Sequence, residues 1–362
     1  MSTDFHPLKI SAVDRLTKDS VAIDFLVPEE LKAKFEYKQG QHLTVKAEIN
    51  GQDIRRSYSI CTSATSQALR VGIKAIENGI FSNYANKELK KGMTLEVMPP
   101  QGHFYSELSS ESNKQYLLIA VGSGITPILS QIETILECEP NSQITLLYGN
   151  KRTPLMMFRE HICFLKNQYM GRLKIFNFFT KEENDAVILN GRISAQKIVD
   201  LDQARMIRIK EFNDVFVCGP ETMTLEIAKA FKSWGYDDSH IHYELFFSGA
   251  AAELAEKTQA ERAKKYGLKT SSVSVKVAGR KVLMDLEMGG DNILDAAIEN
   301  GADLPFSCKA GVCATCKAKV IKGKVEMDMN HSLTEQELAD GMILTCQAHP
   351  VSDEVEIDFD FS

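Results

Sequence analysis

The stretch Cys308-Lys-Ala-Gly-Val-Cys313-Ala-Thr-Cys316 places three cysteines within nine residues, and Cys346 follows thirty residues later. Three thiolates on one tight loop can surround a small metal centre, and a distant fourth thiolate closes the site and ties the loop to the core. Ala310, Gly311, Ala314 and Thr315 are small, so backbone N–H groups can approach the sulfur atoms, and Gly311 can adopt a positive φ where the loop reverses. The pattern therefore predicts a metal site with four cysteine ligands.

The C-x4-C-x2-C spacing with a distant fourth cysteine is typical of the ligands of a [2Fe–2S] cluster. A zinc site and unrelated buried cysteines are the alternatives. Zinc loops more often pair one C-x2-C with a second, and the second pair is missing here. The other four cysteines share no spacing with one another; they are Cys61, Cys138, Cys163 and Cys218. Three of these four are interpreted as packing residues.

Residues 271–362 are expected to form the domain that carries this cluster. Strand patterns SVSVKVAG and KVLMDLEM precede a predicted helix in NILDAAIENG, with Asp291 or Asn292 as its cap and Gly301 just past its end. The preceding segment, 249–270, is rich in Ala, Glu and Lys and poor in large apolar residues, which predicts an exposed linker.

Residues 111–248 alternate strand and helix patterns, which predicts a parallel α/β sheet. The buried strand YLLIAV runs into Gly122-Ser123-Gly124-Ile125-Thr126-Pro127, where the glycines let the backbone approach a phosphate and the proline suits a first helical turn. Cys218-Gly219-Pro220-Glu221-Thr222-Met223 follows another strand. Ligands bind α/β sheets outside the carboxyl ends of strands, so these motifs predict a dinucleotide site; turn chemistry alone is the alternative for the glycine motif.

The choice between NADPH and NADH depends on the end of the second strand, because an acid there binds a ribose hydroxyl and a cation accepts a 2′-phosphate. This chain has Asn150, Lys151 and Arg152 at that point and no acid. The sequence therefore predicts NADPH, with NADH possible. The alternative is that the two cations belong to a solvated loop.

Residues 1–110 read as short antiparallel strands separated by turn residues, which fits a small β-barrel. Arg56-Ser57-Tyr58-Ser59 lies at a strand end, where an arginine can neutralise a pyrophosphate, a tyrosine can stack on a flavin ring and a serine can bond its polar edge. About twenty residues later, Gly79-Ile80-Phe81-Ser82 opens a short helix whose free N–H groups suit a phosphate. Together the motifs predict a flavin site.

The net charge of −7 is unevenly distributed. Residues 271–362 contain 8 Lys and Arg against 16 Asp and Glu, whereas the rest contains 34 against 33. This acidity argues against nucleic-acid binding and predicts docking on a basic partner, with a solvated surface as the alternative. We see no signal peptide and no apolar run long enough for a membrane span, so we expect a cytoplasmic protein without a membrane partner.

With these motifs in order, the chain resembles the ferredoxin–NADP reductase superfamily fused to a plant-type ferredoxin. The resembling stretches are RRSYSIC, GMTLEVMPPQGHF, AVGSGITP, the YGN turn and GADLPFSCKAGVCATCKAKVIKGKV with SLTEQELADGMILTCQA. The resemblance implies a multidomain fold: an antiparallel β-barrel flavin domain (1–110), an α/β parallel-sheet nucleotide domain (111–248), a linker (249–270) and an α+β, β-grasp ferredoxin domain (271–362).

Within that superfamily the chain is similar to reductases of aromatic-ring epoxidases. This implies FAD, a preference for NADPH, and a diiron oxygenase partner that epoxidises phenylacetyl-CoA in phenylacetate catabolism. The implied catalytic residues are Ser59, Cys218 and Glu244. The implied cofactor-binding residues are Arg56, Ser57, Tyr58, Ser59, Lys74, Gly79, Ile80, Phe81, Ser82, Gly122, Gly124, Thr126, Asn150, Lys151, Arg152, Cys218, Gly219, Pro220 and Met223; the metal ligands are Cys308, Cys313, Cys316 and Cys346.

The cofactors predict a path from NADPH to FAD, then to the [2Fe–2S] cluster and its partner. Two other functions remain open. One is a reductase for another redox partner, such as a hybrid-cluster protein or a different aromatic oxygenase. The other is a non-catalytic binding or scaffolding subunit with a structural zinc site, which would lack visible absorption.

Overall fold

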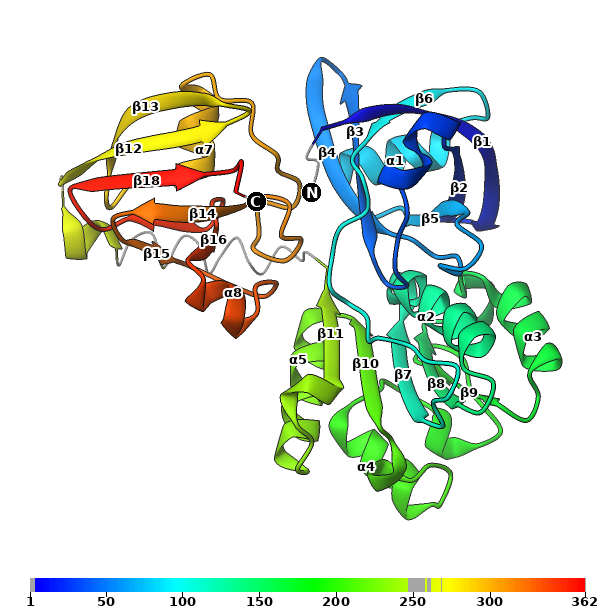
Figure 1. Ribbon diagram of the computed structural model, residues 1–362. Helices are drawn as coiled ribbons and strands as arrows, with labels where there is room; N and C mark the ends of the chain where they lie inside the picture. The colour runs from blue at the N-terminus through cyan, green and yellow to red at the C-terminus, as the bar shows by residue number, and fades with distance from the viewer. Residues whose placement is uncertain (1–3, 247–257, 259–261, 268, 362) are drawn as a thin grey trace. The chain divides into compact units, whose positions relative to one another are not determined.

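The computed structural model describes residues 4–246, 258, 262–267 and 269–361. The described residues form two compact units, one of residues 4–246 and one that begins after this range and extends to residue 361 (Figure 1). The first unit carries the predicted flavin and nucleotide motifs, and the second carries the four cysteines.

The first part of unit 4–246 is an antiparallel sheet with the strand order β4-β3-β6-β1-β2-β5. Its strands are β1 (His6–Thr17), β2 (Ser20–Leu26), β3 (His42–Ile49), β4 (Gln52–Ser59), β5 (Leu69–Lys74) and β6 (Thr94–Val97). A bridge between Ile60, just after β4, and Val71 of β5 joins the two edges, so the sheet closes into a barrel. Helix α1 (Ile80–Lys87) follows β5 and buries Phe81 and Ala85 in the barrel core. The predicted antiparallel fold is confirmed.

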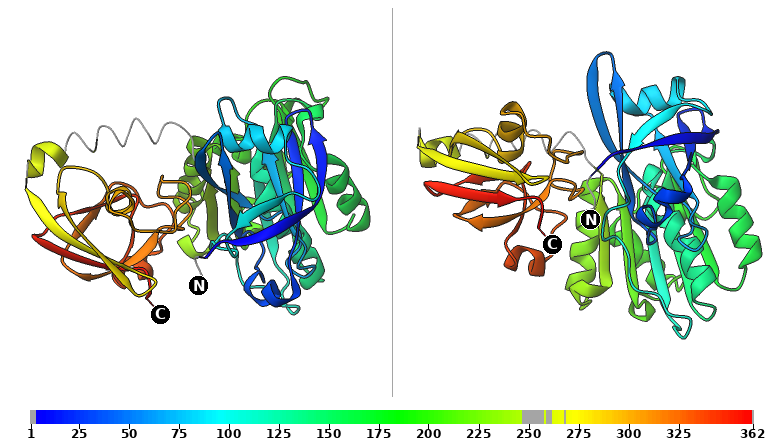
Figure 2. Two further views of the ribbon diagram at one scale, coloured as in Figure 1. Left: turned by 90° about the horizontal axis from the view of Figure 1, so that it is seen from above. Right: turned by 45° about the horizontal axis from the view of Figure 1, so that its top comes forward.

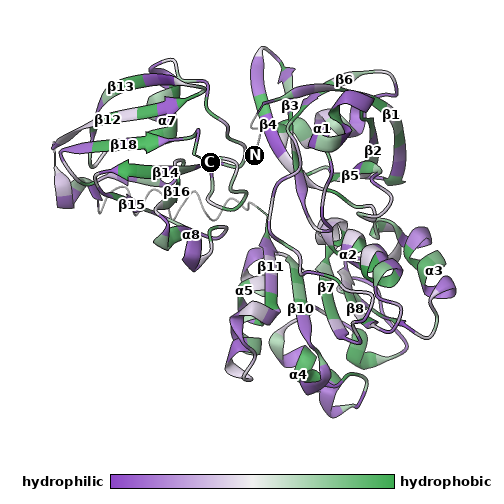
Figure 3. Ribbon diagram, in the orientation of Figure 1, coloured by the Kyte–Doolittle hydropathy of each residue, from purple (hydrophilic) through white to green (hydrophobic). Residues whose placement is uncertain are grey.

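The second part of this unit is a five-stranded parallel sheet with the order β11-β10-β7-β8-β9. Its strands are β7 (Gln115–Val121), β8 (Gln143–Asn150), β9 (Leu173–Phe179), β10 (Asp214–Gly219) and β11 (Ile241–Leu245). The central strands are apolar along their length, as Figure 3 shows for β7, β8 and β10, because helices cover both faces. The predicted α/β fold is confirmed.

Successive side chains of β7 point to opposite faces of this sheet and divide the core in two. Leu118 and Ala120 pack with α2 (Ile125–Cys138) and α3 (Arg159–Gln168). Leu117 and Ile119 pack with α4 (Ala195–Gln203) and α5 (Glu221–Ser233). Figure 2 shows these helices on the two sides of the sheet.

The strand order of the parallel sheet reverses at β7. The chain runs from β7 to β8 and β9 in one direction, then returns to β10 and β11 on the other side of β7. Such a reversal opens a crevice outside the carboxyl ends of the two strands that flank it. The crevice therefore lies between the ends of β7 and β10, which carry the two predicted nucleotide motifs.

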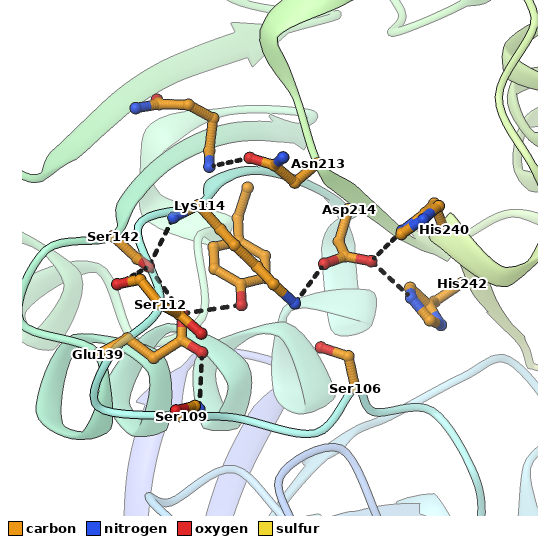
Figure 4. A network of polar contacts seen from close by, with 12 residues as sticks. Ser106, Ser109, Ser112, Lys114, Glu139, Ser142, Asn213, Asp214, His240 and His242 are labelled. Carbon is orange, nitrogen blue, oxygen red and sulfur yellow. Dashed lines mark hydrogen bonds and ion pairs between the residues drawn. The ribbon is translucent and has the colours of Figure 1, made fainter.

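The opposite end of the parallel sheet is held by a buried carboxylate. The Asp214 side chain accepts hydrogen bonds from Lys114 Nζ at 3.1 Å, His240 Nδ1 at 3.0 Å and His242 Nε2 at 3.3 Å (Figure 4). Burial by itself would raise the pKa of Asp214, but the hydrogen bonds from His242, His240 and Lys114 outweigh it and keep the pKa well below its usual range. The ionised carboxylate thus ties the starts of β7, β10 and β11 together.

A second buried acid fixes the segment that joins the barrel to the parallel sheet. Glu139 is fully buried and accepts hydrogen bonds from Tyr116 Oη at 2.9 Å, Ser142 Oγ at 2.7 Å and the Ser109 N–H at 3.1 Å (Figure 4). The residues just before β7 are thereby anchored to the end of α2.

The second unit has a five-stranded sheet with the order β13-β12-β18-β14-β16 and a two-stranded sheet of β15 and β17. Its elements are β12 (Thr270–Val277), β13 (Arg280–Glu287), α7 (Ile293–Glu299), β14 (Lys317–Lys322), β15 (Val325–Met327), α8 (Glu335–Ala339), β16 (Met342–Leu344), β17 (Ala348–Pro350) and β18 (Glu354–Asp358). The Asn292 side chain caps α7, accepting from the Asp295 N–H at 2.9 Å, and Gly301 follows with φ +86°. Both capping predictions are confirmed.

Most of the predicted linker, residues 249–257, 259–261 and 268, lies outside the described residues. In its described part, Arg262 is 6% exposed and forms an ion pair with Asp328, while Lys265 and Tyr266 both contact the Glu326 carboxylate. Residues 262–267 therefore pack within the second unit, to which they belong. Within the described part of the chain, no helix is both long and apolar enough to cross a membrane.

Candidate functional site

The four cysteines of the predicted metal site lie together in the second unit. The sulfur atoms of Cys308 and Cys313 are within hydrogen-bonding reach of each other, and those of Cys316 and Cys346 form a second such pair. Cys313, Cys316 and Cys346 are at most 6% exposed, and Cys308 is partly exposed. The cysteine loop and the segment after β16 therefore bring all four predicted ligands to one place.

Backbone and side-chain donors surround these sulfur atoms. The Ala310 N–H donates to Cys308 Sγ at 3.3 Å. Hydrogen bonds from the Cys308 thiol and from Thr315 lower the pKa of Cys313 to about 6, although burial opposes the shift. Hydrogen bonds from Cys316 and from the Gly311 N–H likewise lower the pKa of Cys346. The same two thiol hydrogen bonds raise the pKa of the donor thiols, Cys308 and Cys316, so in each pair one sulfur donates a hydrogen bond to the other.

The sulfur atoms form two pairs that lie close to each other, since Cys313 also interacts electrostatically with Cys316 and Cys346. Two pairs of thiols fit a cluster of two irons, with one pair for each iron. The donor set is thus the one that the [2Fe–2S] prediction requires.

The cluster loop contains three residues with positive φ. They are Lys309 (52°), Gly311 (71°) and Ala314 (53°). The value at Gly311 agrees with the predicted reversal, whereas two non-glycine residues in this region indicate a strained loop. Lys309 Nζ forms an ion pair with Asp295 of α7 at 2.5 Å, so a side-chain contact holds the strained loop on the domain.

The two predicted flavin motifs meet in the barrel. Tyr58 at the end of β4 packs on Phe81 of α1 with 5.6 Å between the ring centroids. Arg56 is exposed on the same strand, and the Ser57 and Thr44 hydroxyl oxygens are 3.3 Å apart. Strand and helix therefore present an arginine, two serine hydroxyls, an aromatic ring and a helix N-terminus within one region, a donor set that fits a flavin with a pyrophosphate.

The four residues of the predicted phosphate cradle, 79–82, differ in where their side chains lie. Gly79 precedes α1, and a Cβ there would lie 2.4 Å from Ser82 Oγ. Ser82 Oγ accepts from the Ile76 N–H and donates to the Gly79 carbonyl, so this hydroxyl stabilises the turn itself. Phe81 is 1% exposed and fills the core, whereas Ile80 is 42% exposed. The predicted phosphate contact therefore depends on main-chain N–H groups at the start of α1 rather than on the Ser82 hydroxyl.

Lys74, which the resemblance assigns to the cofactor site, ends β5 a few residues before the same turn. Its Nζ lies 3.8 Å from the Asp19 carboxylate. The lysine is therefore paired across the barrel edge, and its place in the cofactor site stays a prediction.

The two nucleotide motifs meet at the crevice between β7 and β10. A Cβ on Gly124 would lie 2.2 Å from the Cys218 carbonyl oxygen and 3.0 Å from the Gly219 nitrogen. Gly124 is therefore the residue that lets the start of α2 touch the end of β10. Gly122 has φ +59° with open space around its Cβ position, so glycine is favoured there by backbone conformation.

Side chains of these motifs also support the backbone. Thr126 is 2% exposed and its Oγ1 donates to the Ser123 carbonyl at 3.0 Å, at the first turn of α2. The methyl group of Met223 occupies the space beside Gly219, 2.9 Å from where a Cβ would lie. Pro220 directly precedes α5 and is exposed.

The end of β8 carries the residues predicted to select the nucleotide. Asn150 is 6% exposed, and its Nδ2 has no hydrogen-bond partner among the described residues. Asn150 lies at the carboxyl end of β8, the edge of the parallel sheet at which ligands bind. Lys151 and Arg152 follow it and are exposed. Glu182, which no sequence motif indicates, accepts from the Thr153 N–H at 2.8 Å beside these cations.

The three predicted catalytic residues are brought together from both parts of unit 4–246. Ser59 Oγ, at the end of barrel strand β4, donates to Glu244 Oε2 of β11 at 2.9 Å. Glu244 is paired in register with Cys218 of β10. Ser59 and Cys218 are buried, and the Glu244 side chain is 14% exposed. These contacts join the flavin motif to the nucleotide crevice.

His42 is a further residue of this cluster, and it is absent from the residues predicted from the sequence. It is paired with Ser59 across β3 and β4, and its Nδ1 lies 3.8 Å from Glu244 Oε1. The motif at 56–59 indicates that β4 lies at the site. No local sequence pattern indicates that His42, on the neighbouring strand β3, lies there too. Only the strand register shows its position.

Comparison with known proteins assigns a family to each part of the chain. Residues 7–105 match the oxidoreductase FAD-binding domain family, 118–229 the oxidoreductase NAD-binding domain family, and 275–351 the 2Fe-2S iron-sulfur cluster binding domain family. Together with the fold, these matches define an oxidoreductase that uses a nicotinamide nucleotide, FAD and a [2Fe–2S] cluster.

The chain is 44% identical over 359 residues to one of the subunits of 1,2-phenylacetyl-CoA epoxidase from Escherichia coli K12, covering 99% of this chain and 98% of the relative. It is 30% identical over 355 residues to the ferredoxin reductase component of 3-ketosteroid-9-alpha-monooxygenase from Rhodococcus rhodochrous, covering 97% and 96%. The chain therefore belongs to the family of oxygenase reductases that includes these two proteins.

Solved structures show the same fold at lower identity. Phthalate dioxygenase reductase matches with a TM-score of 0.59 and 19% identity, and the match covers 98% of both chains. An intact type IV self-sufficient cytochrome P450 monooxygenase matches with a TM-score of 0.68 and 18% identity, over 98% of this chain and 41% of that longer protein.

Proposed function

We propose that this chain delivers electrons from NADPH, through FAD and the [2Fe–2S] cluster, to a diiron oxygenase that epoxidises phenylacetyl-CoA. The 44% identity over nearly the whole chain to a protein of the 1,2-phenylacetyl-CoA epoxidase supports the partner. The observation that carries the reductase site is the 2.9 Å hydrogen bond from Ser59 to Glu244, since it joins the barrel motif to the nucleotide crevice.

In this proposal each residue of the joined site has a role in binding or orientation. Ser59 is oriented by Glu244 and lies where the flavin motif ends. Burial, with the nearby Glu244 carboxylate, raises the pKa of Cys218 well above its usual value, so Cys218 stays an uncharged thiol that can pack on an uncharged ring. Holding the nicotinamide ring and the flavin ring against each other accelerates hydride transfer between them. When bound, NADPH supplies a hydride, FAD converts the electron pair into single electrons, and the cluster passes them on singly.

The binding roles follow from the donors each element presents. Arg56 and the N–H groups at the start of α1 would hold the FAD pyrophosphate, and Tyr58 would cover the flavin ring. Gly122, Gly124 and Asn150 would line the nucleotide site. The two cysteine pairs would hold the irons of the cluster.

We expect Lys151 and Arg152 to select NADPH by binding its 2′-phosphate. Exchanging both for glutamine should raise the KM for NADPH by roughly tenfold for each charge-assisted hydrogen bond that the exchange removes, with little effect on the KM for NADH. Steady-state kinetics with both nucleotides measures this difference. Lys174→Gln, an exposed cation near the other end of the sheet, is the control and should leave both KM values unchanged. Equal changes for NADPH and NADH in the double variant would refute the assignment.

A coupled assay tests the whole proposal. The purified chain and NADPH are mixed with the candidate diiron oxygenase and phenylacetyl-CoA, and NADPH loss is compared with ring-epoxide product. Product that forms in step with NADPH consumption would establish the partner. NADPH oxidation without product, while cytochrome c is still reduced, would retain the reductase and discard this partner in favour of another oxygenase or a hybrid-cluster protein.

A further inference from the structure

Gln347, the residue after the fourth cysteine, lies inside the cluster site. It is 6% exposed and sits between β16 and β17. Its main chain is held on both sides, because its N–H donates to the Leu344 carbonyl at 2.9 Å and its carbonyl accepts from the Asp328 N–H at 2.9 Å. The backbone therefore fixes where its side chain begins.

The side-chain amide of Gln347 faces the cluster ligands. Its Nε2 lies 3.7 Å from Cys346 Sγ, 3.0 Å from the Cys346 carbonyl oxygen and 3.2 Å from the Lys309 carbonyl oxygen. Cys346 belongs to the second pair of cysteines, whereas Lys309 directly follows the first cysteine of the loop. One amide group thus spans the two segments that carry the ligands.

The rest of the side chain is equally confined. Cγ of Gln347 lies 3.1 Å from the position that a Cβ on Gly311 would occupy, so the loop reversal is packed against it. Its Oε1 is buried and has no hydrogen-bond partner among the described residues. Burial of an amide oxygen without a hydrogen bond lowers the stability of the fold. The hydrogen bonds from the NH2 group to three acceptors offset this loss.

We propose that Gln347 sets the reduction potential of the cluster by donating an N–H to Cys346 Sγ, and that it slows cluster loss by linking Cys346 to the Lys309 carbonyl. A donor to a ligand sulfur stabilises negative charge on that sulfur, and the reduced cluster carries one more negative charge than the oxidised cluster. The hydrogen bond therefore favours reduction. The inference rests on the four cysteines holding a [2Fe–2S] cluster.

The test compares the full chain with Gln347→Met, which removes the donor and keeps an unbranched side chain, and Gln347→Glu, which replaces the donor with an oxygen. A redox titration followed by the electron paramagnetic resonance signal of the reduced cluster gives the midpoint potential. We expect Gln347→Met to lower the equilibrium constant for reduction by about tenfold, or 59 mV for a one-electron couple, and Gln347→Glu to lower it further.

The rate of cluster loss to a chelator, followed by visible absorption, is the second measurement and should rise severalfold in both variants. Gln336→Met is the matched control, because Gln336 is an exposed residue of α8 in the same unit and its side-chain amide donates to Asp340, away from the cysteines. It should change neither quantity.

An unchanged midpoint potential in Gln347→Met, with the spectrum intact, would overturn the inference and leave the cluster assignment standing. A wild-type chain without a [2Fe–2S] spectrum would overturn both. If Gln347→Glu retains too little cluster to titrate, the accelerated loss supports the linking role, and Gln347→Met decides the effect on potential.

Discussion

Replacing Cys313 by alanine should reduce the transfer of electrons to cytochrome c to the background rate, while NADPH still bleaches the flavin. Cys313 is 6% exposed and is paired with Cys308, so its loss removes one of the four predicted ligands of the cluster. The cluster is the step between the flavin and the partner, and the flavin and nucleotide sites lie in the other unit. Hydride uptake should therefore persist when electron export is lost.

Stopped-flow absorption at the flavin band measures the first step, and cytochrome c reduction measures the second. Cys163→Ala is the matched control, because Cys163 is an exposed thiol on α3 outside the cluster, and it should leave both rates unchanged. Undiminished cytochrome c reduction in Cys313→Ala would contradict the series arrangement of the two cofactors.

Replacing Gly124 by alanine should lower kcat/KM for NADPH by about 100-fold, because a displacement of about 1 Å at a binding site has an effect of that size. The new methyl group would lie 2.2 Å from the Cys218 carbonyl oxygen, and this neighbour is main chain that cannot rotate away. The start of α2 and the end of β10 would have to separate, which displaces both nucleotide motifs. Steady-state kinetics and a titration of NADP+ binding measure the effect.

Gly171→Ala serves as the control, since a Cβ at Gly171 meets nothing within 4 Å and its φ is not positive. Its unfolding free energy should change by less than about 0.5 kcal/mol. Dithionite reduction of the bound flavin in Gly124→Ala separates a damaged nucleotide site from general unfolding. Wild-type kinetics in Gly124→Ala would show that the two motifs do not need their close contact.

Several features could be predicted from the sequence because they depend on neighbours in the chain. The cysteine spacing indicates the cluster loop, and Gly311 does adopt the positive φ expected of it. The strand, the glycine turn and the helix of residues 116–138 follow from local hydrophobic patterns and turn chemistry, and the structure shows them at β7 and α2. The order of the three domains follows from the order of these motifs.

The role of individual side chains within a motif was less predictable. Phe81 and Ser82 fall inside the predicted phosphate cradle, yet one fills the barrel core and the other bonds its own turn. Thr126 likewise bonds the start of its own helix. A short motif specifies which residues lie near a ligand, whereas packing decides which of them turn towards it.

The sequence by itself determined the kinds of site in this protein: four thiols at cluster spacing, a flavin strand and a glycine turn at a nucleotide crevice. The tertiary structure decided which of these residues meet. Ser59 bonds Glu244, 185 positions away, and Gly124 touches Cys218. Gln347 reaches Lys309 across the cluster loop. Such contacts arise from strand register and from the closure of long loops around a packed core, and no local pattern of residues encodes them.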